Sequence, residues 1–194
     1  INHTYAIYGP YNVTLSVITS DGCSSTPKTV TLNVNPQPKA IFALPPSACL
    51  PDANINFVSN STIADGSQAS FTYLWNFGDP PSGTVNTSTA ANPSHTYVTT
   101  GPFSINLQVT SSAGCIHDTS MALTTIHPQP LAAFNADKVD VCVGGSFTFT
   151  DNSNPLDGTI SQWNWVMDDG NTRNVPGFIY TYSTPRVYNV SLFI

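Results

Sequence analysis

The chain repeats itself at an interval of about 92 residues, and this repeat limits the fold to a series of similar modules. Three separate segments coincide when the sequence is shifted by 92 positions: His3-Thr4-Tyr5 with His95-Thr96-Tyr97, Gly22-Cys23 with Gly114-Cys115, and Pro36-Gln37-Pro38 with Pro128-Gln129-Pro130. Because separate segments match at the same shift, one short motif met by chance does not explain them.

A third copy follows at a slightly different offset, which a change in loop length explains. Residues 73–79 match residues 163–169, and Tyr97 matches Tyr182. Since the chain starts and stops inside a unit, we expect it to be a piece of a longer protein. The expected domains are the C-terminal part of one repeat at 1–37, a complete repeat at 38–129 and the N-terminal part of a third at 130–194.

The composition indicates an all-β protein. Only 8% of residues are charged, the net charge is −6, and all 11 acidic residues are Asp. Strong helix formers are therefore scarce, while residues typical of strands and turns abound. No basic cluster exists that could follow a nucleic-acid backbone, and no apolar run of about 18 residues could insert into a membrane. Neither nucleic acid nor a bilayer is an expected partner of this segment.

Apolar residues alternate along each repeat, as in strands with one buried face. In the complete copy the inward positions are Ala40, Phe42 and Leu44, then Ile55 and Phe57, then Tyr73, Trp75 and Phe77, and finally Phe103, Ile105, Leu107 and Val109. Turn formers separate these runs, and about seven short strands suit a sandwich of two antiparallel sheets. We expect tandem immunoglobulin-like β-sandwiches whose cores hold Trp75, Phe77, Tyr97, Trp165 and Tyr182.

Three motifs in this order resemble the PKD (polycystic-kidney-disease) domain: Tyr73-Leu74-Trp75-Asn76-Phe77-Gly78-Asp79, then His95-Thr96-Tyr97, then residues 101–109. The regular cysteines further resemble tandem PKD arrays in large surface proteins of Bacteroidetes-type bacteria. The resemblance implies an extended array of PKD-type sandwiches on the cell surface or secreted. Pro80, Asp168 and Arg186 depart from the family pattern, which weakens any claim that the loop has one fixed binding shape.

The residues predict no catalytic site. Asp168 and Asp169 are adjacent at a strand end, where neighbouring side chains point to opposite faces and Asp is a common turn residue. No G-x-S-x-G elbow is present that would present a serine nucleophile. His3 and His95 share one repeat position, which indicates a structural hydrogen bond. His117 and His127 have no histidine counterpart in the first copy and are expected on the surface.

No metal or other cofactor is expected either. If a loop did bind calcium, as some PKD domains do, Asp79, Asp168 and Asp169 would be its ligands. A calcium loop of the D-x-[DN]-x-[DN]-G type is absent, however, and the loop is read as a turn. The aromatic residues lie mostly on the inward side of the strands, so a sugar-binding platform is not expected. Only rings of outward parity, such as Tyr8 or Phe193, could serve outside, and they are too few for a platform.

The cysteines are regularly placed at Cys23, Cys49, Cys115 and Cys142, without a C-x-x-C pair, which favours disulfides over zinc. Cys49 precedes the second strand and Cys115 follows the turn after the strand at 103–109, so the two are expected at opposite ends of one sandwich. We therefore expect disulfides between neighbouring repeats. Cys115 would pair with a cysteine before residue 1, and Cys49 with one beyond residue 194. A Cys49–Cys115 bond within the repeat remains the main alternative.

These features predict a non-catalytic extracellular array that serves as the stalk, filament or adhesin spacer of a bacterial surface protein. Its partners would be neighbouring repeats, other copies through open sheet edges, or a cell-surface or glycan ligand. The alternative is a set of spacer or substrate-binding accessory modules in a secreted hydrolase, such as a protease or chitinase. A catalytic domain elsewhere in a longer chain would favour that alternative.

Overall fold

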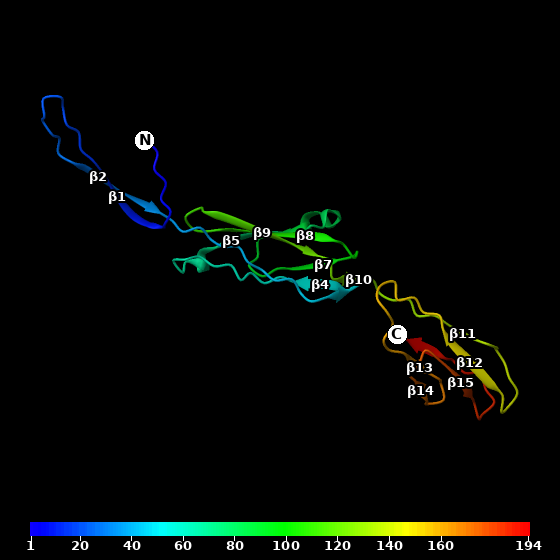
Figure 1. The fold of residues 1–194 in the computed structure, drawn as a ribbon. Helices are drawn as coiled ribbons and strands as arrows, with labels where there is room; N and C mark the ends of the chain where they lie inside the picture. Colours follow the sequence, from blue (N-terminus) through cyan, green and yellow to red (C-terminus); the bar gives the residue numbers. More distant parts are fainter. The chain divides into compact units, whose positions relative to one another are not determined.

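The computed structural model describes all residues from 1 to 194 and consists of β-strands, turns and two short 3-10 helices, η1 (Gln68–Ser70) and η2 (Pro80–Asn86) (Figure 1). The expected all-β, immunoglobulin-like fold is confirmed. Contacts divide the chain into two compact units. The first comprises Ile1–Pro46, Asn54–Tyr97 and Gly101–Thr125, and the second comprises Ser47–Ala53, Val98–Thr100 and Ile126–Ile194.

The middle repeat has a four-stranded antiparallel sheet opposite a two-stranded one, as Figure 1 shows in green and cyan. The larger sheet has the order β6 (Thr87–Ser88), β5 (Thr72–Asn76), β8 (Phe103–Thr110) and β9 (Ile116–Leu123). The smaller sheet pairs β4 (Ala53–Asn56) with β7 (Ser94–Tyr97). In β8 every second residue is buried, because these side chains face the opposite layer.

Trp75 lies at the centre of this sandwich with none of its surface exposed. Its ring contacts those of Phe42 and Phe57, with centroids 5.2 and 5.5 Å away. The indole N–H donates to the carbonyl oxygen of Ala90 at 3.1 Å, so the polar atom of the buried ring is satisfied. Phe77 and Tyr97 are also buried in this core.

The segment entering the middle repeat forms isolated bridges rather than the continuous strand expected around residues 40–44. Lys39 pairs with Thr62 and Phe42 with Ser59. Farther on, β3 (Ala48–Cys49) pairs in parallel with β10 (Ile126–His127), the last strand of the repeat. Prolines around this segment lack an N–H donor, which limits a regular ladder.

The first repeat is represented by an antiparallel hairpin of β1 (Gly9–Leu15) and β2 (Lys28–Val34). The turn between these strands repeats a turn of the middle repeat bond for bond. Thr19 and Cys23 make the same reciprocal hydrogen bonds as Ser111 and Cys115: the first residue's N–H donates to the Cys carbonyl, and the Cys N–H donates to the first residue's hydroxyl oxygen. The sequence repeat therefore corresponds to a structural repeat.

The third repeat builds two three-stranded sheets, with orders β11-β12-β15 and β14-β13-β16. Their bounds are Phe134–Ala136 for β11, Ser146–Asp151 for β12, Asn164–Val166 for β13, Thr172–Arg173 for β14, Gly177–Thr181 for β15 and Ser191–Phe193 for β16. Trp165 is fully buried between them, and its N–H donates to the carbonyl oxygen of Val175 at 2.9 Å. This arrangement reproduces the environment of Trp75, and Tyr182 lies in the same core.

Candidate functional site

A buried polar pair in the middle repeat joins the loop after β5 to strand β7. His95 Nε2 lies 3.1 Å from Asp79 Oδ2, and both residues are only 5% exposed. The imidazole stacks on Phe77, with ring centroids 4.5 Å apart. A carboxylate and an imidazole together are common in active sites, so this pair is the first place to look for chemistry.

Hydrogen bonds from neighbouring groups fix the backbone around this buried pair. The N–H of Asp79 donates to Asn86 Oδ1 at 2.7 Å, and the Ser82 hydroxyl donates to the Asp79 carbonyl oxygen at 2.7 Å. The Tyr97 hydroxyl donates to the carbonyl oxygen of Phe77 at 2.9 Å. Burial, with a smaller contribution from the charge of Asp79, raises the pKa of Tyr97. Such a network fixes the loop and offers no open face to a substrate.

The third repeat keeps this arrangement with one member exchanged. Asp169 occupies the place of Asp79, and Tyr180 occupies the place of His95. The Tyr180 hydroxyl donates to Asp169 Oδ2 at 2.6 Å, and this hydrogen bond is the main reason why the pKa of Asp169 is lowered. Tyr182 donates to the carbonyl oxygen of Met167 at 2.9 Å, as Tyr97 does to Phe77. The common element is a donor on the strand and an Asp acceptor on the loop.

Two departures from the family pattern in the third repeat contact each other. Asp168 replaces Gly78 and keeps its left-handed backbone, with φ of 61° against 68°. Arg186 donates from Nη1 to Asp168 Oδ2 at 3.2 Å and from Nη2 to the Asp168 carbonyl oxygen. The backbone N–H of Asn189 donates to the same carboxylate at 3.0 Å. These bonds hold a residue with a side chain in a conformation that favours glycine.

The three aspartates expected as ligands of any calcium ion are not brought together. Asp79 faces His95, Asp168 faces Arg186, and Asp169 faces Tyr180. No group of three or more His, Cys or Asp side chains in this structure could surround a metal ion. The carboxylates are thus engaged by protein donors.

His117 is placed differently from its expected surface position. It is half-buried, and its Nδ1 accepts the backbone N–H of Ala40 at 3.2 Å. The expectation was wrong because the partner lies in the entering segment, far away in sequence. His127 is also of intermediate burial, with 45% of its side-chain surface exposed, and its Nδ1 lies 2.6 Å from Asp157 Oδ2. Sequence reasoning missed Asp157, whose pKa this hydrogen bond lowers.

All four cysteines have free thiols in this structure, so no bond joins Cys49 to Cys115. Cys49 lies in β3 beside β10, whereas Cys115 precedes β9. The eight residues of β9 alone span about 27 Å, whereas a disulfide needs Cα atoms within about 7 Å.

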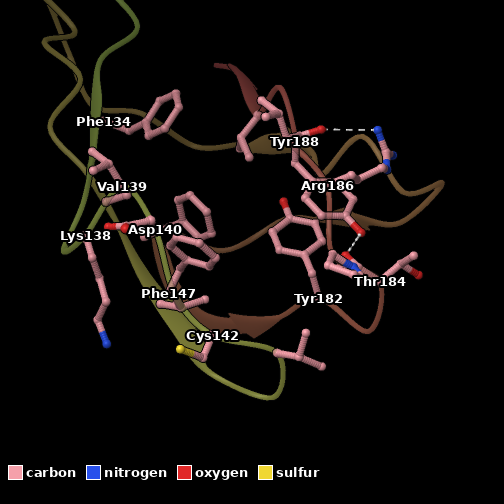
Figure 2. A pocket seen from close by; sticks show the side chains of 17 residues that line it. Phe134, Lys138, Val139, Asp140, Cys142, Phe147, Tyr182, Thr184, Arg186 and Tyr188 are labelled. Carbon is pink, nitrogen blue, oxygen red and sulfur yellow. Dashed lines mark hydrogen bonds between the residues drawn. The ribbon is translucent and has the colours of Figure 1, made fainter.

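A cavity of about 520 Å³ opens in the third repeat between β11, β12 and the segment before β16 (Figure 2). Phe134, Phe147, Tyr182 and Tyr188 line it with aromatic rings. Tyr188 corresponds to Phe103, which pairs with the fully buried Leu123 of β9 in the middle repeat. The cavity therefore lies where strand β9 packs in the middle repeat. This correspondence accounts for its apolar lining without a ligand.

The sandwich, the Trp cores and the polar pair agree with the comparison to known families. A profile described as "PKD domain" matches residues 35–126 and 127–194. The chain belongs to the PKD domain family. Both segments of the match follow one another directly, so this PKD chain is a tandem array.

Among curated proteins, this PKD chain is similar to "Pre-pro-metalloprotease PrtV" of two Vibrio cholerae serotype O1 strains, with 27% identity over 140 residues. The match covers 71% of the chain and 14% of PrtV, so the chain spans a small part of that protein's length.

Among solved structures, the PKD1 domain of Vibrio anguillarum Epp is 25% identical, covers 45% of the chain and 92% of that domain, and has a TM-score of 0.37. A structure of carbohydrate-binding modules from the β-sandwich superfamily is 17% identical, covers 81% and 84% of the two chains, and has a TM-score of 0.40. No helix of the structure has the length and hydropathy needed to cross a membrane.

Proposed function

We propose that this chain is a non-catalytic extracellular spacer that transmits tension between the parts of a longer protein. The proposal is based on the contacts in the middle repeat between its N-terminal segment (37–50) and its C-terminal strands (116–127). Four contacts join the two segments in parallel order: Gln37 with Ile116, Ala40 with His117, Ala48 with Ile126, and Leu50 with His127.

Three of these contacts are hydrogen bonds of 3.0–3.2 Å. Gln37 Nε2 donates to the Ile116 carbonyl oxygen at 3.0 Å, the Ala40 N–H to His117 Nδ1 at 3.2 Å, and the Leu50 N–H to the His127 carbonyl oxygen at 3.0 Å. Because the segments run in parallel, tension between the repeat's two ends slides them past each other. Several bonds must then break together, whereas a peeling force would break them one by one.

The polar pairs support the same function. The Asp79–His95 and Asp169–Tyr180 bonds fix the loops after the central strands in both repeats and leave no reactive group unengaged there. Within this proposal the array is the stalk or filament segment of a bacterial surface protein, with neighbouring repeats as its first partners.

Stretching single molecules of the 194-residue chain tests the spacer function. The middle repeat should unfold in one discrete event that releases about 30 nm, because residues 35–126 extend by about 3.4 Å each. A smooth extension without a discrete event would contradict the proposal.

The similarity to PrtV favours a second candidate, in which the repeats are accessory modules of a secreted protease that hold its substrate. This role predicts that the chain binds insoluble protein. Incubation with insoluble elastin and with chitin, followed by sedimentation, separates the two functions. A spacer should stay in the supernatant with both materials, whereas depletion by elastin, reversed by soluble elastin peptides, would favour the accessory role.

A further inference from the structure

The cysteines occupy two fixed places in the repeats. Cys23 and Cys115 close the same hydrogen-bonded turn, and both follow a glycine with nearly the same φ, 83° and 82°. Cys49, in the two-residue strand β3, and Cys142 lie in the connection that precedes β4 or β12. Cys23 and Cys115 are two copies of the first position, Cys49 and Cys142 are two copies of the second, and the middle repeat carries one of each. We call them the turn cysteine and the loop cysteine.

The turn cysteine lies at the linker that enters its own repeat. Cys115 is followed by Ile116, whose carbonyl oxygen accepts a hydrogen bond from Gln37 Nε2 at 3.0 Å. Gln37 is the centre of the linker Pro36-Gln37-Pro38. The start of β5 is also at this end, because Thr72 pairs with Thr110. The loop that precedes β5 and the turn with Cys115 are therefore neighbours.

The loop cysteine lies at the linker that leaves its repeat. Cys49 pairs with His127, and the linker Pro128-Gln129-Pro130 follows directly. His127 also reaches Asp157, which lies in the loop preceding β13 of the third repeat. In the middle repeat, the corresponding loop precedes β5, at the end that carries the turn cysteine. His127 is therefore the strand partner of Cys49 and also contacts, through Asp157, the end of the next repeat at which a turn cysteine would lie.

We infer that the loop cysteine of each repeat forms a disulfide with the turn cysteine of the repeat that follows it. A three-residue linker spans about 10 Å, and the His127–Asp157 contact draws the two ends together, so Cα atoms within about 7 Å are attainable. In this chain Cys49 would pair with the turn cysteine of a completed third repeat, and Cys115 with the loop cysteine of a completed first repeat.

The cross-link forms by thiol–disulfide exchange with oxidised glutathione or a disulfide-bearing oxidoreductase. The two cysteines lose two protons and two electrons, one S–S bond forms, and the oxidant's disulfide is reduced to two thiols. The inference rests on the proposed extracellular role for its oxidising compartment. It has a separate test, because the discrete unfolding event expected of the spacer requires no disulfide.

Completing the third repeat gives the first test. Ile194 corresponds to Val109, because Trp165 pairs with Leu192 as Trp75 pairs with Leu107. A copy of residues 110–129 is therefore appended after Ile194, which adds strand β9 and one turn cysteine. After oxidation in a glutathione buffer, peptide mapping should find Cys49 bonded to the added cysteine. Cys23, Cys115 and Cys142 should remain open to alkylation.

Matched variants and a second protein sharpen the result. Cys49→Ser should abolish the bond, and Cys142→Ser should leave it unchanged. Independently, a copy of residues 38–92 placed before Ile1 completes the first repeat, and its added loop cysteine should bond to Cys115. A bond between loop and turn cysteines of one repeat, or free thiols in both extended proteins after oxidation, would overturn the inference.

Discussion

The loop after the central strand is built in two ways in neighbouring repeats. The middle repeat uses Gly78, whose missing side chain lets Ser104 approach: a Cβ there would lie 2.5 Å from the Ser104 carbonyl oxygen. The third repeat has Asp168 in the same backbone conformation, bonded to Arg186 and to the Asn189 N–H. Asn189 is the counterpart of Ser104. Close packing in one repeat is thus replaced by hydrogen bonds in the other.

The polar pairs differ in the same sense. Asp79 and His95 are both buried, whereas Asp169 is exposed and is held by Tyr180. The two repeats therefore keep the same backbone conformation in this loop but stabilise it with different side-chain interactions. A binding or catalytic loop would need the same chemical groups in each copy, whereas a structural loop needs only the same geometry.

The largest expected effect comes from Gly78→Ala. The new Cβ would collide with the Ser104 backbone, and alanine is strained at φ of 68°, so the middle repeat should lose about 3 kcal/mol or more. Hydrogen exchange under increasing urea, read separately for each repeat, measures this loss. The matched change Asp168→Gly should alter the third repeat little, since relieved strain offsets the lost bonds. Equal effects would break the comparison.

The next effect is that of Asp79→Ala, which leaves His95 buried without its partner. We expect the middle repeat to lose about 2–3 kcal/mol in the same measurement. Asp169→Ala should destabilise the third repeat less, because water can replace the carboxylate beside Tyr180. The double variant Asp79→Ala with His95→Phe should recover part of the loss. A larger cost at Asp169 than at Asp79 would contradict this ranking.

Tyr97→Phe and Tyr182→Phe should each cost about 1 kcal/mol, since each removes one hydroxyl that donates to a backbone carbonyl. Burial, followed by the charge of Asp169, raises the pKa of Tyr182 to about 12. Unfolded tyrosine ionises near about 10. The stability that Tyr182 contributes is therefore complete below about pH 10 and is lost as the pH rises through about 12.

Urea unfolding between pH 9 and pH 12 measures this dependence. In Tyr182→Phe, the free energy of unfolding of the third repeat should fall less steeply as the pH rises. An unchanged profile in that variant would assign the loss to other groups.

The smallest expected effect is that of Arg186→Ala. Both side chains of the Arg186–Asp168 pair are partly exposed, so the third repeat should lose less than about 1 kcal/mol. Adding Asp168→Gly to this variant should recover most of the loss, because the glycine needs no partner. A double-variant cycle without coupling would show that the two departures are unrelated.

Much of the sandwich could be predicted from the sequence. The alternation around Trp75 and the repeat itself come from local pattern, and the structure buries Trp75, Phe77, Tyr97, Trp165 and Tyr182. The shared position of His3 and His95 indicated a structural hydrogen bond. Its partner Asp79 could not be named, because the pairing depends on two loops that meet only in the fold.

The Asp168–Arg186 contact left a signal in the sequence, which was interpreted only as variation in the loop. Two departures from the family pattern fall in the same repeat, which is typical of residues that compensate each other. The role of His117 left no such signal. Its partner is the backbone N–H of Ala40, and a backbone donor has no sequence identity.

Stretching the wild-type chain beside the variant Leu50→Pro with His117→Ala tests the central claim most directly. The variant lacks the Leu50 N–H that donates to His127 and the His117 ring that accepts from Ala40. If tension passes through these parallel contacts, the middle repeat of the variant should unfold at a clearly lower force, with the same released length. An unchanged unfolding force in a folded variant would contradict the claim.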